Sequence, residues 1–189
     1  MCLSRLVLTH GARQAHAWLI FNVGQNMNLD SLPWTVIQAR NDAGLVVVFR
    51  HRKFPAGFSK ATFPHRLNVF WNSRASTESG LPDEADSKAM GTFEDRLVEA
   101  TEPDEQSVLS LVVTGKNQRE WVFHTKSTDE FLRRLTVMPQ EQDPYPIEIR
   151  HTSDSEWEYV DRVLGDIAAP PEDPKPTRRG LFARMFRKQ

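Results

Sequence analysis

The strongest constraint on the fold is that four predicted strands each place their apolar side chains on one face. Side chains alternate between the two faces of a strand, so residues two apart share a face. In residues 66–72, 106–115, 120–126 and 147–152, one of the two alternating sets carries two or three successive apolar residues. These are Leu67, Val69, Trp71, Leu109, Leu111, Val113, Trp121, Phe123, Ile147 and Ile149. This pattern predicts a sheet with one face buried under helices.

The opposite face of the same strands is predicted to be of mixed polarity. Such a face is expected to be either partly open to water or covered by the N-terminal hairpin. Its residues are Asn68, Phe70, Ser110, Val112, Val122, His124, Glu148 and Arg150.

The residues between the strands have the periodicity of helices. Segment 88–102 has apolar residues at spacings of three and four, and segment 127–138 opens with Ser-Thr-Asp, which is typical of an N-cap. A third helix is predicted over 153–167, with Ser153 or Asp154 as its N-cap. The order from residue 66 is therefore strand, helix, strand, strand, helix, strand, and a last helix.

This order predicts an α+β fold of the ferredoxin-like type, a split β-α-β arrangement with an antiparallel sheet and helices on one face. A β-hairpin is predicted to precede it, because residues 34–40 and 45–50 are rich in β-branched and aromatic side chains and Asn-Asp-Ala-Gly joins them.

The domain boundaries follow from composition. Residues 27–167 are predicted to form a single domain, which suits a chain of 189 residues. Residues 1–26 have no clean period and are interpreted as a mis-assigned start before Met27 or as a disordered or loosely packed extension. A Pro-rich linker is predicted over 168–177, and a basic amphipathic tail over 178–189.

Composition favours a soluble, cytoplasmic protein. Hydrophobic residues make up 39% of the chain and charged residues 26%. No run approaches the roughly 20 apolar residues that span a bilayer, and the N-terminus makes a poor signal peptide. The single cysteine, Cys2, cannot form an internal disulfide, which also favours the cytoplasm.

Charge is distributed unevenly along the chain. Residues 1–77 carry a net +7 and residues 78–105 a net −8, so we expect the two blocks to neutralise each other in the fold. Within the first block, segment 48–66 has five Lys/Arg and four Phe and no acid, a composition found in proteins that bind single-stranded nucleic acid. The acidic block competes for these cations and the overall net charge is −1, so nucleic-acid binding is the lesser interpretation.

Six segments resemble, in order and spacing, the bacterial family known as domain of unknown function 695: "WTVIQARNDAGLVVVFR", "FPHRLNVFWN", "GLP", "FEDRL", "REWVFHT" and "YPIEIRHTSDSEWEY". The resemblance covers residues 34–164. Two positions depart from the family pattern, with Ser155 in place of a frequent Pro and His124 in place of a frequent Tyr. The resemblance implies no established activity. It does imply an analogy to domains like the protein inhibitor of ribonuclease E, which have a ferredoxin-like architecture, and so favours a protein-binding regulator.

Motifs for metal, cofactor or nucleophilic chemistry are not found in the sequence. The six histidines form no H-E-x-x-H pattern, and one cysteine excludes a thiolate metal site. There is no G-x-S-x-G elbow and no Gly-rich phosphate or dinucleotide loop. We therefore predict no metal, no cofactor and no catalytic residue.

Two weak binding sites are predicted. Arg50, Arg66, His124 and Arg150 are expected near the mixed sheet face, where an arginine cluster suits a carboxylate or phosphate ligand or an acidic partner. The tail is expected to contact an anionic membrane or to dock on a partner, since it combines basic and apolar side chains. Its residues are Arg178, Arg179, Leu181, Phe182, Arg184, Met185, Phe186, Arg187 and Lys188.

These observations predict a non-enzymatic binding or regulatory protein with an unidentified protein partner. The tail would bring it to that partner or to the inner face of the membrane. One alternative is an unrecognised hydrolase or nuclease-like enzyme that uses the acidic helix or His124. Another is a weak nucleic-acid binder that uses segment 48–66.

Overall fold

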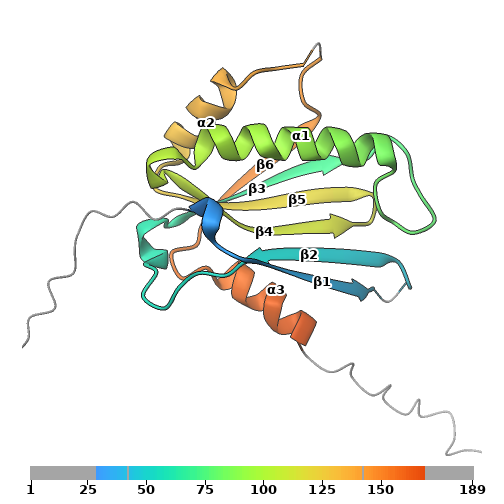
Figure 1. The fold of residues 1–189 in the computed structure, drawn as a ribbon, viewed down its shortest axis with the longest axis horizontal. Helices are drawn as coiled ribbons and strands as arrows, with labels where there is room; N and C mark the ends of the chain where they lie inside the picture. The colour runs from blue at the N-terminus through green and yellow to red at the C-terminus, as the bar shows by residue number, and fades with distance from the viewer. Residues whose placement is uncertain (1–28, 42, 142, 169–189) are drawn as a thin grey trace, which may run out of the picture.

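The computed structural model describes residues 29–41, 43–141 and 143–168, which form a six-stranded sheet and three α-helices (Figure 1). The strands are β1 (Trp34–Arg40), β2 (Val46–Arg52), β3 (His65–Asn72), β4 (Ser107–Gly115), β5 (Gln118–Thr125) and β6 (Ile147–Ser153). The helices are α1 (Glu84–Thr101), α2 (Thr128–Val137) and α3 (Glu158–Ala168). The α+β class predicted from the sequence is confirmed.

All neighbouring strands are antiparallel, in the order β1-β2-β4-β5-β3-β6. The predicted hairpin is present as β1 and β2, but it does not cover the mixed face of the sheet. It pairs edge to edge with β4 instead, with Phe49 opposite Val113, and so extends the sheet by two strands. In this position β2 pairs with the backbone N–H and C=O groups along the edge of β4, which would otherwise be left unmatched.

The main core lies between the sheet and helices α1 and α2. Its strand residues include Leu67, Val69, Trp121 and Phe123, as the alternation predicts, and all four are fully or almost fully buried. From α1, Met90, Phe93 and Leu97 pack on this face, and Phe131 packs on it from α2. The alternation of strand residues therefore predicts this face of the core well.

One part of the predicted face is wrong, because β4 contains a β-bulge. Leu109 pairs with Phe123 and Leu111 pairs with Val122, so Ser110 is an extra residue on β4. Beyond the bulge the alternation is reversed. Val112, expected on the mixed face, packs in the core beneath α1, whereas Leu111 and Val113 pack on the other side of the sheet.

The opposite face of the sheet is covered by α3. Val160 of α3 packs with Leu111 and Val122, and Val163 and Leu164 adjoin this cluster. The prediction of helices on one face thus describes α1 and α2, while α3 makes a third layer behind the sheet. A smaller cluster of Leu29, Phe63, Val108 and Trp157 closes the end of the sheet near the start of α3.

Helix ends follow their capping residues. Ser127 accepts a hydrogen bond from the Glu130 N–H and caps α2, as predicted. Helix α1 starts four residues earlier than predicted, because Asp83 caps it by accepting from the Asp86 N–H. Helix α3 starts later than predicted, since the Asp154 carboxylate accepts from the Glu158 N–H.

No helix in the described part of the chain has the length and apolar character needed to cross a membrane. The predicted N-terminal extension, nearly all of the linker and the basic tail lie outside the described residues.

Candidate functional site

A polar pocket lies between the hairpin and α1, on the α1 side of the sheet. Its volume is about 360 Å³, within the range of small ligand sites. We call it the hairpin pocket, and its lining residues are Trp34, Arg50, Arg52, Glu94, Asp95, Val98, Glu99 and Leu109.

Strand alternation places the hairpin side chains of this pocket on one face. Trp34 of β1 lies opposite Arg52 of β2, and Val36 lies opposite Arg50. Residues two apart share a face, so Trp34, Val36, Arg50 and Arg52 all point to the α1 side. Helix α1 supplies the facing wall.

Arg50 forms an ion pair with Glu94 of α1. Its Nη2 donates to both carboxylate oxygens of Glu94 at 2.6 Å, and the indole Nε1 of Trp121 donates to Oε2 at 2.7 Å. Glu94 is therefore held by two donors from different strands. Burial lowers the pKa of the neighbouring Arg119, with the Glu94 charge acting in the opposite direction.

Arg52 forms a buried ion pair with Glu102 at the end of α1. Its Nη1 lies 2.8 Å from Oε1 of Glu102, and the side chains are only 4% and 6% exposed. The same oxygen accepts from the Leu109 N–H at 2.7 Å. The Arg52 Nε is buried and has no hydrogen-bond partner among the described residues. Both guanidinium groups lie over the Trp34 ring, at 4.8 Å for Arg52 and 5.5 Å for Arg50.

The rim of the hairpin pocket is acidic. Asp95 and Glu99 of α1 are exposed, and neither carboxylate has a hydrogen bond or ion pair within the described part of the chain. Since Glu94 and Glu102 already neutralise the two arginines, these two carboxylates give the pocket a negative net charge.

Apolar side chains continue the same face of the hairpin beyond the pocket. Val36 is 63% exposed, and Val46 and Val48 are half-buried. We call Trp34, Val36, Val46 and Val48 the hairpin face. An exposed apolar strip beside a polar pocket is typical of a contact surface for another molecule.

Two of the predicted site residues, Arg66 and His124, meet on the α3 side of the sheet. Arg66 Nη1 donates to Oδ2 of Asp154 at 2.7 Å, and the same oxygen lies 3.8 Å from Nε2 of His124. Burial raises the pKa of Asp154, but hydrogen bonds from Arg66 and from the backbone of Tyr159 and Glu158 outweigh it, so the pKa is lowered. This network ties β3 and β5 to the start of α3.

Ser110, His124 and Asp154 have the residue types of a hydrolase triad, but all three side chains are buried from solvent. Ser110 Oγ lies 3.0 Å from Nδ1 of His124 and also donates to the Val122 carbonyl oxygen. Ser110 is 1% exposed, His124 0% and Asp154 8%. The Trp157 ring stacks on His124 with centroids 4.0 Å apart. Burial lowers the pKa of His124 to about 3, so its imidazole is neutral at pH 7 and serves packing.

The four residues predicted as an anion site do not form one site. Arg50 lies on the opposite face from Arg66 and His124, in the ion pair with Glu94. Arg150 shares the face of Arg66, since it lies opposite Asn68 on the edge strand β6. It is exposed, however, and donates to Glu148 at 2.7 Å while its guanidinium lies 4.8 Å from the Phe70 ring.

Most of the basic and aromatic side chains of segment 48–66 are used inside the fold. The pairs are Arg50–Glu94, Arg52–Glu102, Lys60–Asp161 and Arg66–Asp154. The first two confirm that the basic and acidic blocks neutralise each other. Phe54 and Phe58 pack on Trp157 with centroids 5.1 and 5.5 Å away, and Phe63 is buried. Their rings are thus occupied by core contacts.

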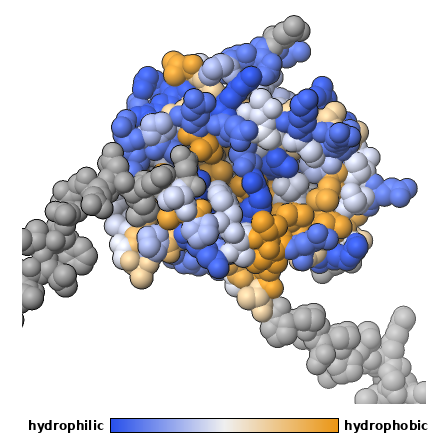
Figure 2. Space-filling model, viewed as in Figure 1, coloured by the Kyte–Doolittle hydropathy of each residue, from blue (hydrophilic) through white to orange (hydrophobic). Residues whose placement is uncertain are grey.

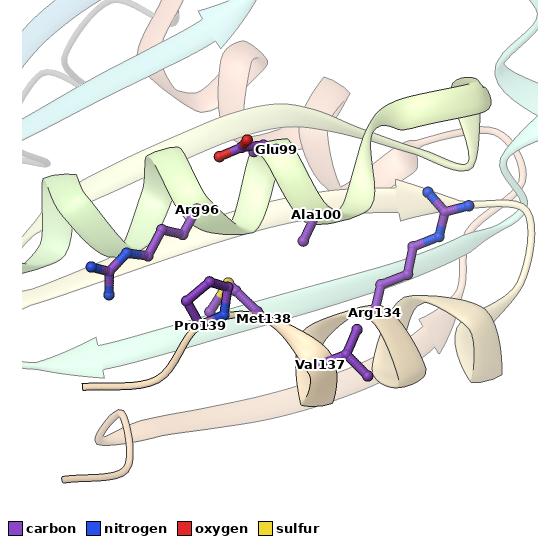
Figure 3. A pocket seen from close by; sticks show the side chains of 7 residues that line it. All are labelled: Arg96, Glu99, Ala100, Arg134, Val137, Met138 and Pro139. Carbon is purple, nitrogen blue, oxygen red and sulfur yellow. The ribbon is translucent and has the colours of Figure 1, made fainter. Parts of the chain in front are cut away.

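A second pocket, of about 230 Å³, lies between α1 and α2 (Figure 3). Met138 and Pro139 lie in its middle, with Arg96 and Arg134 at opposite ends (Figure 3). Arg96 donates to Glu141 and Tyr145, and Arg134 donates to Glu130 and to the Pro103 carbonyl oxygen. Both arginines therefore already have partners from the same chain.

No group of three or more His, Cys, Asp or Glu side chains among the described residues is placed to hold a metal ion. The His65 ring lies 5.5 Å from the ring of His151.

The sequence did not single out Trp34 or Arg52 as site residues, and it indicated the acids of α1 only for the enzyme alternative. Arg52 and Glu102 lie 50 positions apart, so their contact follows only from the antiparallel placement of the hairpin beside β4. One signal was present: Trp34 leads the first strand, and Arg50 and Arg52 are spaced by two on the second.

Comparison with curated proteins gave no match, and comparison with solved structures gave none either. One family model matches residues 33–163. This range begins next to Trp34, contains every residue that lines the hairpin pocket and extends into α3. The chain belongs to the family of unknown function DUF695.

Proposed function

We propose that this protein is a non-enzymatic binding module that regulates or recruits a protein partner through the hairpin pocket and the hairpin face. The observation that carries this proposal is a pair of carboxylates, Asp95 and Glu99, that have no partner among the described residues and lie beside a half-buried tryptophan and an exposed valine. Interfaces combine an apolar centre that contains aromatic residues with a polar rim, and this surface has both parts.

The chemistry of the surface favours a basic, partly apolar segment of the partner. A Lys or Arg side chain would pair with Asp95 or Glu99 while its methylene groups lie against Trp34. Apolar side chains of the same segment would cover Val36 and Val48. Because the pocket's own arginines are engaged by Glu94 and Glu102, an acidic partner would have to displace an internal ion pair first.

We also propose that the part of the sheet formed by β3, β4, β5 and β6 is ferredoxin-like. The spatial order β6-β3-β5-β4, with α1 connecting β3 to β4 and α2 connecting β5 to β6, supports this arrangement. A cytoplasmic location is part of the same proposal and is supported by the single cysteine in the sequence.

The test is affinity capture from a bacterial lysate with the full chain, carried out with and without nuclease and read by mass spectrometry. The variants are Asp95→Asn with Glu99→Gln, and Val36→Asp. The matched control is Glu84→Gln, because Glu84 is an exposed acid of the same helix that does not line the pocket. Each change is at an exposed position, so the fold should be retained.

We expect at least one protein to be captured by the wild type and by Glu84→Gln but not by the pocket variant Asp95→Asn with Glu99→Gln, nor by the hairpin-face variant Val36→Asp. Equal retention by all variants would remove the hairpin surface from consideration. A captured species that disappears after nuclease treatment would favour the nucleic-acid interpretation of segment 48–66 instead. A purified partner would then be titrated at two salt concentrations, since pairing of exposed charges weakens with ionic strength.

A further inference from the structure

A second open surface lies on the other side of the hairpin, where it meets the end of α3. A groove of about 340 Å³ runs between the two elements. Figure 2 shows a hydrophobic patch in the lower part of the molecule, where Figure 1 places the hairpin and α3. We call this groove the α3 groove, and its lining residues are Ala39, Arg40, Asn41, Val47, Phe49, Val163, Asp166 and Ile167.

The floor of the α3 groove is apolar and remains partly open to water. Phe49, Val47, Val163 and Ile167 are all half-buried, although Phe49 lies on a strand in the interior of the sheet. The α3 helix covers β4 and β5 through Val160 but leaves this part of the hairpin incompletely covered. An apolar segment placed here would remove these side chains from water.

We propose that residues 181–186 of the same chain dock in the α3 groove through Leu181, Phe182, Met185 and Phe186. This goes beyond the proposed partner surface, because the α3 groove lies on the opposite face of the hairpin and shares no residue with the hairpin pocket. The docked segment would complete the apolar layer between α3 and the hairpin.

Chain length and position favour this occupant. The described residues end at Ala168, next to Ile167, which itself lines the groove. Residues 169–180 separate this point from Leu181, and because four of these twelve residues are proline, their reach is about 37 Å when extended as polyproline II. The four apolar side chains of the segment thus remain at high local concentration beside the groove.

Charge also favours this occupant. Asp166 is exposed at the rim of the groove and has no hydrogen bond or ion pair among the described residues. The segment carries Arg184 and is followed by Arg187 and Lys188. The other charged residue of the rim, Arg40, donates to the Gly44 carbonyl oxygen and so is directed along its own hairpin.

Disulfide trapping in the full chain tests the proposal. Cys2→Ser gives a cysteine-free background, because the sequence has one cysteine. Ala39→Cys with Met185→Cys places one thiol in the groove and one in the segment. The matched control is Val36→Cys with Met185→Cys, since Val36 is on the same strand but on the other face. Both pairs are followed under mild oxidation on non-reducing gels.

We expect the Ala39 pair to close within one molecule at least about tenfold faster than the Val36 pair, because docking raises the effective thiol concentration at one face. Adding Phe182→Ser and Phe186→Ser should reduce the rate to that of the control. These last changes lie in the segment itself, so loss of trapping would not reflect an unfolded domain.

Three results would overturn the proposal. The two pairs could close at equal rates, or the Phe182→Ser and Phe186→Ser changes could leave the fast rate unaltered. The Ala39 pair could instead give a covalent dimer whose yield rises with protein concentration, which would make a second copy the occupant. Equal rates combined with co-sedimentation on phosphatidylserine-containing vesicles would assign the segment to a membrane surface.

Discussion

Arg52 and Glu102 show how a single contact can determine where a whole hairpin sits. The ion pair joins the end of β2 to the end of α1, and Glu102 also receives the Leu109 N–H of β4. Removing either residue would take away the opposite charge from a side chain that water barely reaches. Acidic side chains of the same chain thus neutralise much of the charge of this basic segment. Composition alone does not distinguish such a segment from a binding surface.

Arg52→Met is expected to destabilise the protein by about 3–5 kcal/mol, because it removes the guanidinium charge that faces the buried Glu102 carboxylate. Urea unfolding followed by circular dichroism measures the change in the free energy of unfolding. The double variant Arg52→Met with Glu102→Leu should recover much of the loss, since no buried charge remains. If the single variant costs less than about 1 kcal/mol, the pair is solvated and the buried geometry is wrong.

His124 is expected to make stability depend on pH. Burial lowers its pKa from 6.5 to about 3 in the folded state. Between these values the unfolded chain binds a proton at this imidazole and the folded chain does not, so the free energy of unfolding falls as pH decreases from about 6.5 toward 3. Urea titrations at pH 7, 6, 5 and 4 should show this decrease.

The matched comparison for that titration is His124→Gln, which removes the imidazole and should flatten the decrease between pH 6.5 and 4.5 even if the variant is less stable at every pH. The lowered pKa of Asp154 acts at lower pH, because this carboxylate is ionised in both states above about its ordinary pKa of 3.8. An unchanged slope in His124→Gln would show that another group titrates in this window.

At the scale of the element, α3 is held both by its apolar face and by the residues just before it. Asp154 caps it, and Trp157 packs against His124 and Phe54 while its Nε1 donates to the Phe63 carbonyl oxygen at 3.3 Å. Trp157 adopts a left-handed backbone conformation with φ of 61°, which costs of order 1–3 kcal/mol in a non-glycine residue. The packing of its ring therefore offsets this strain.

Trp157→Ala is expected to lower the free energy of unfolding by about 3–5 kcal/mol, because it removes a large side chain that is only 1% exposed. Trp157→Phe should cost clearly less, since a ring remains to stack on His124. Thermal and urea unfolding of both variants give the comparison. Equal losses would mean that the backbone of this segment, and not the ring, holds α3 in place.

The sequence predicted those elements whose signals are local. Ser127 at the start of α2 and the alternation of Leu67, Val69 and Trp71 both depend on neighbours a few positions away, and both are present in the structure. The bulge at Ser110 has no such local signal, because an extra serine fits the strand pattern equally well on either face. One residue therefore reversed the predicted sides of Leu111 and Val113.

The candidate site was less predictable than the fold, since its contacts join distant parts of the chain. Arg50 was chosen from the sequence, but its partner Glu94 is 44 positions away and lies on a helix whose rotation over the sheet no local pattern gives. The same is true of Arg66 and Asp154, which are 88 positions apart. Residue types indicated cations, and only the topology showed which of them are already paired.

At the scale of the whole molecule, the sheet separates two surfaces with different chemistry. The α1 side presents the acidic rim and the hairpin face, whereas the α3 side presents an apolar groove with one exposed carboxylate. Both surfaces use the hairpin, which adds two strands beyond the area that α1 and α3 cover. The hairpin is thus the part of the fold on which both proposals depend.

The independently stable part of the chain is predicted to extend from residue 27 to residue 168. The three core clusters use residues from Leu29 to Leu164, and Leu29 is buried against Phe63, Val108 and Trp157. A fragment of residues 27–168 should therefore match the full chain to within about 1 kcal/mol in the free energy of unfolding, because a docked tail segment adds only weakly held contacts.

A shorter fragment of residues 34–168 should be less stable than the 27–168 fragment by about 2–4 kcal/mol. It lacks buried Leu29 and half-buried Leu32, which leaves the cavity cost of a deleted core side chain. It also lacks the Pro33 carbonyl oxygen that accepts the Lys53 N–H at 2.8 Å and fixes the start of the hairpin. Urea unfolding of the three proteins side by side measures both differences. Equal stability of the two fragments would mean that Leu29 packs on the surface of the cluster without stabilising it, and the domain would then begin at Trp34.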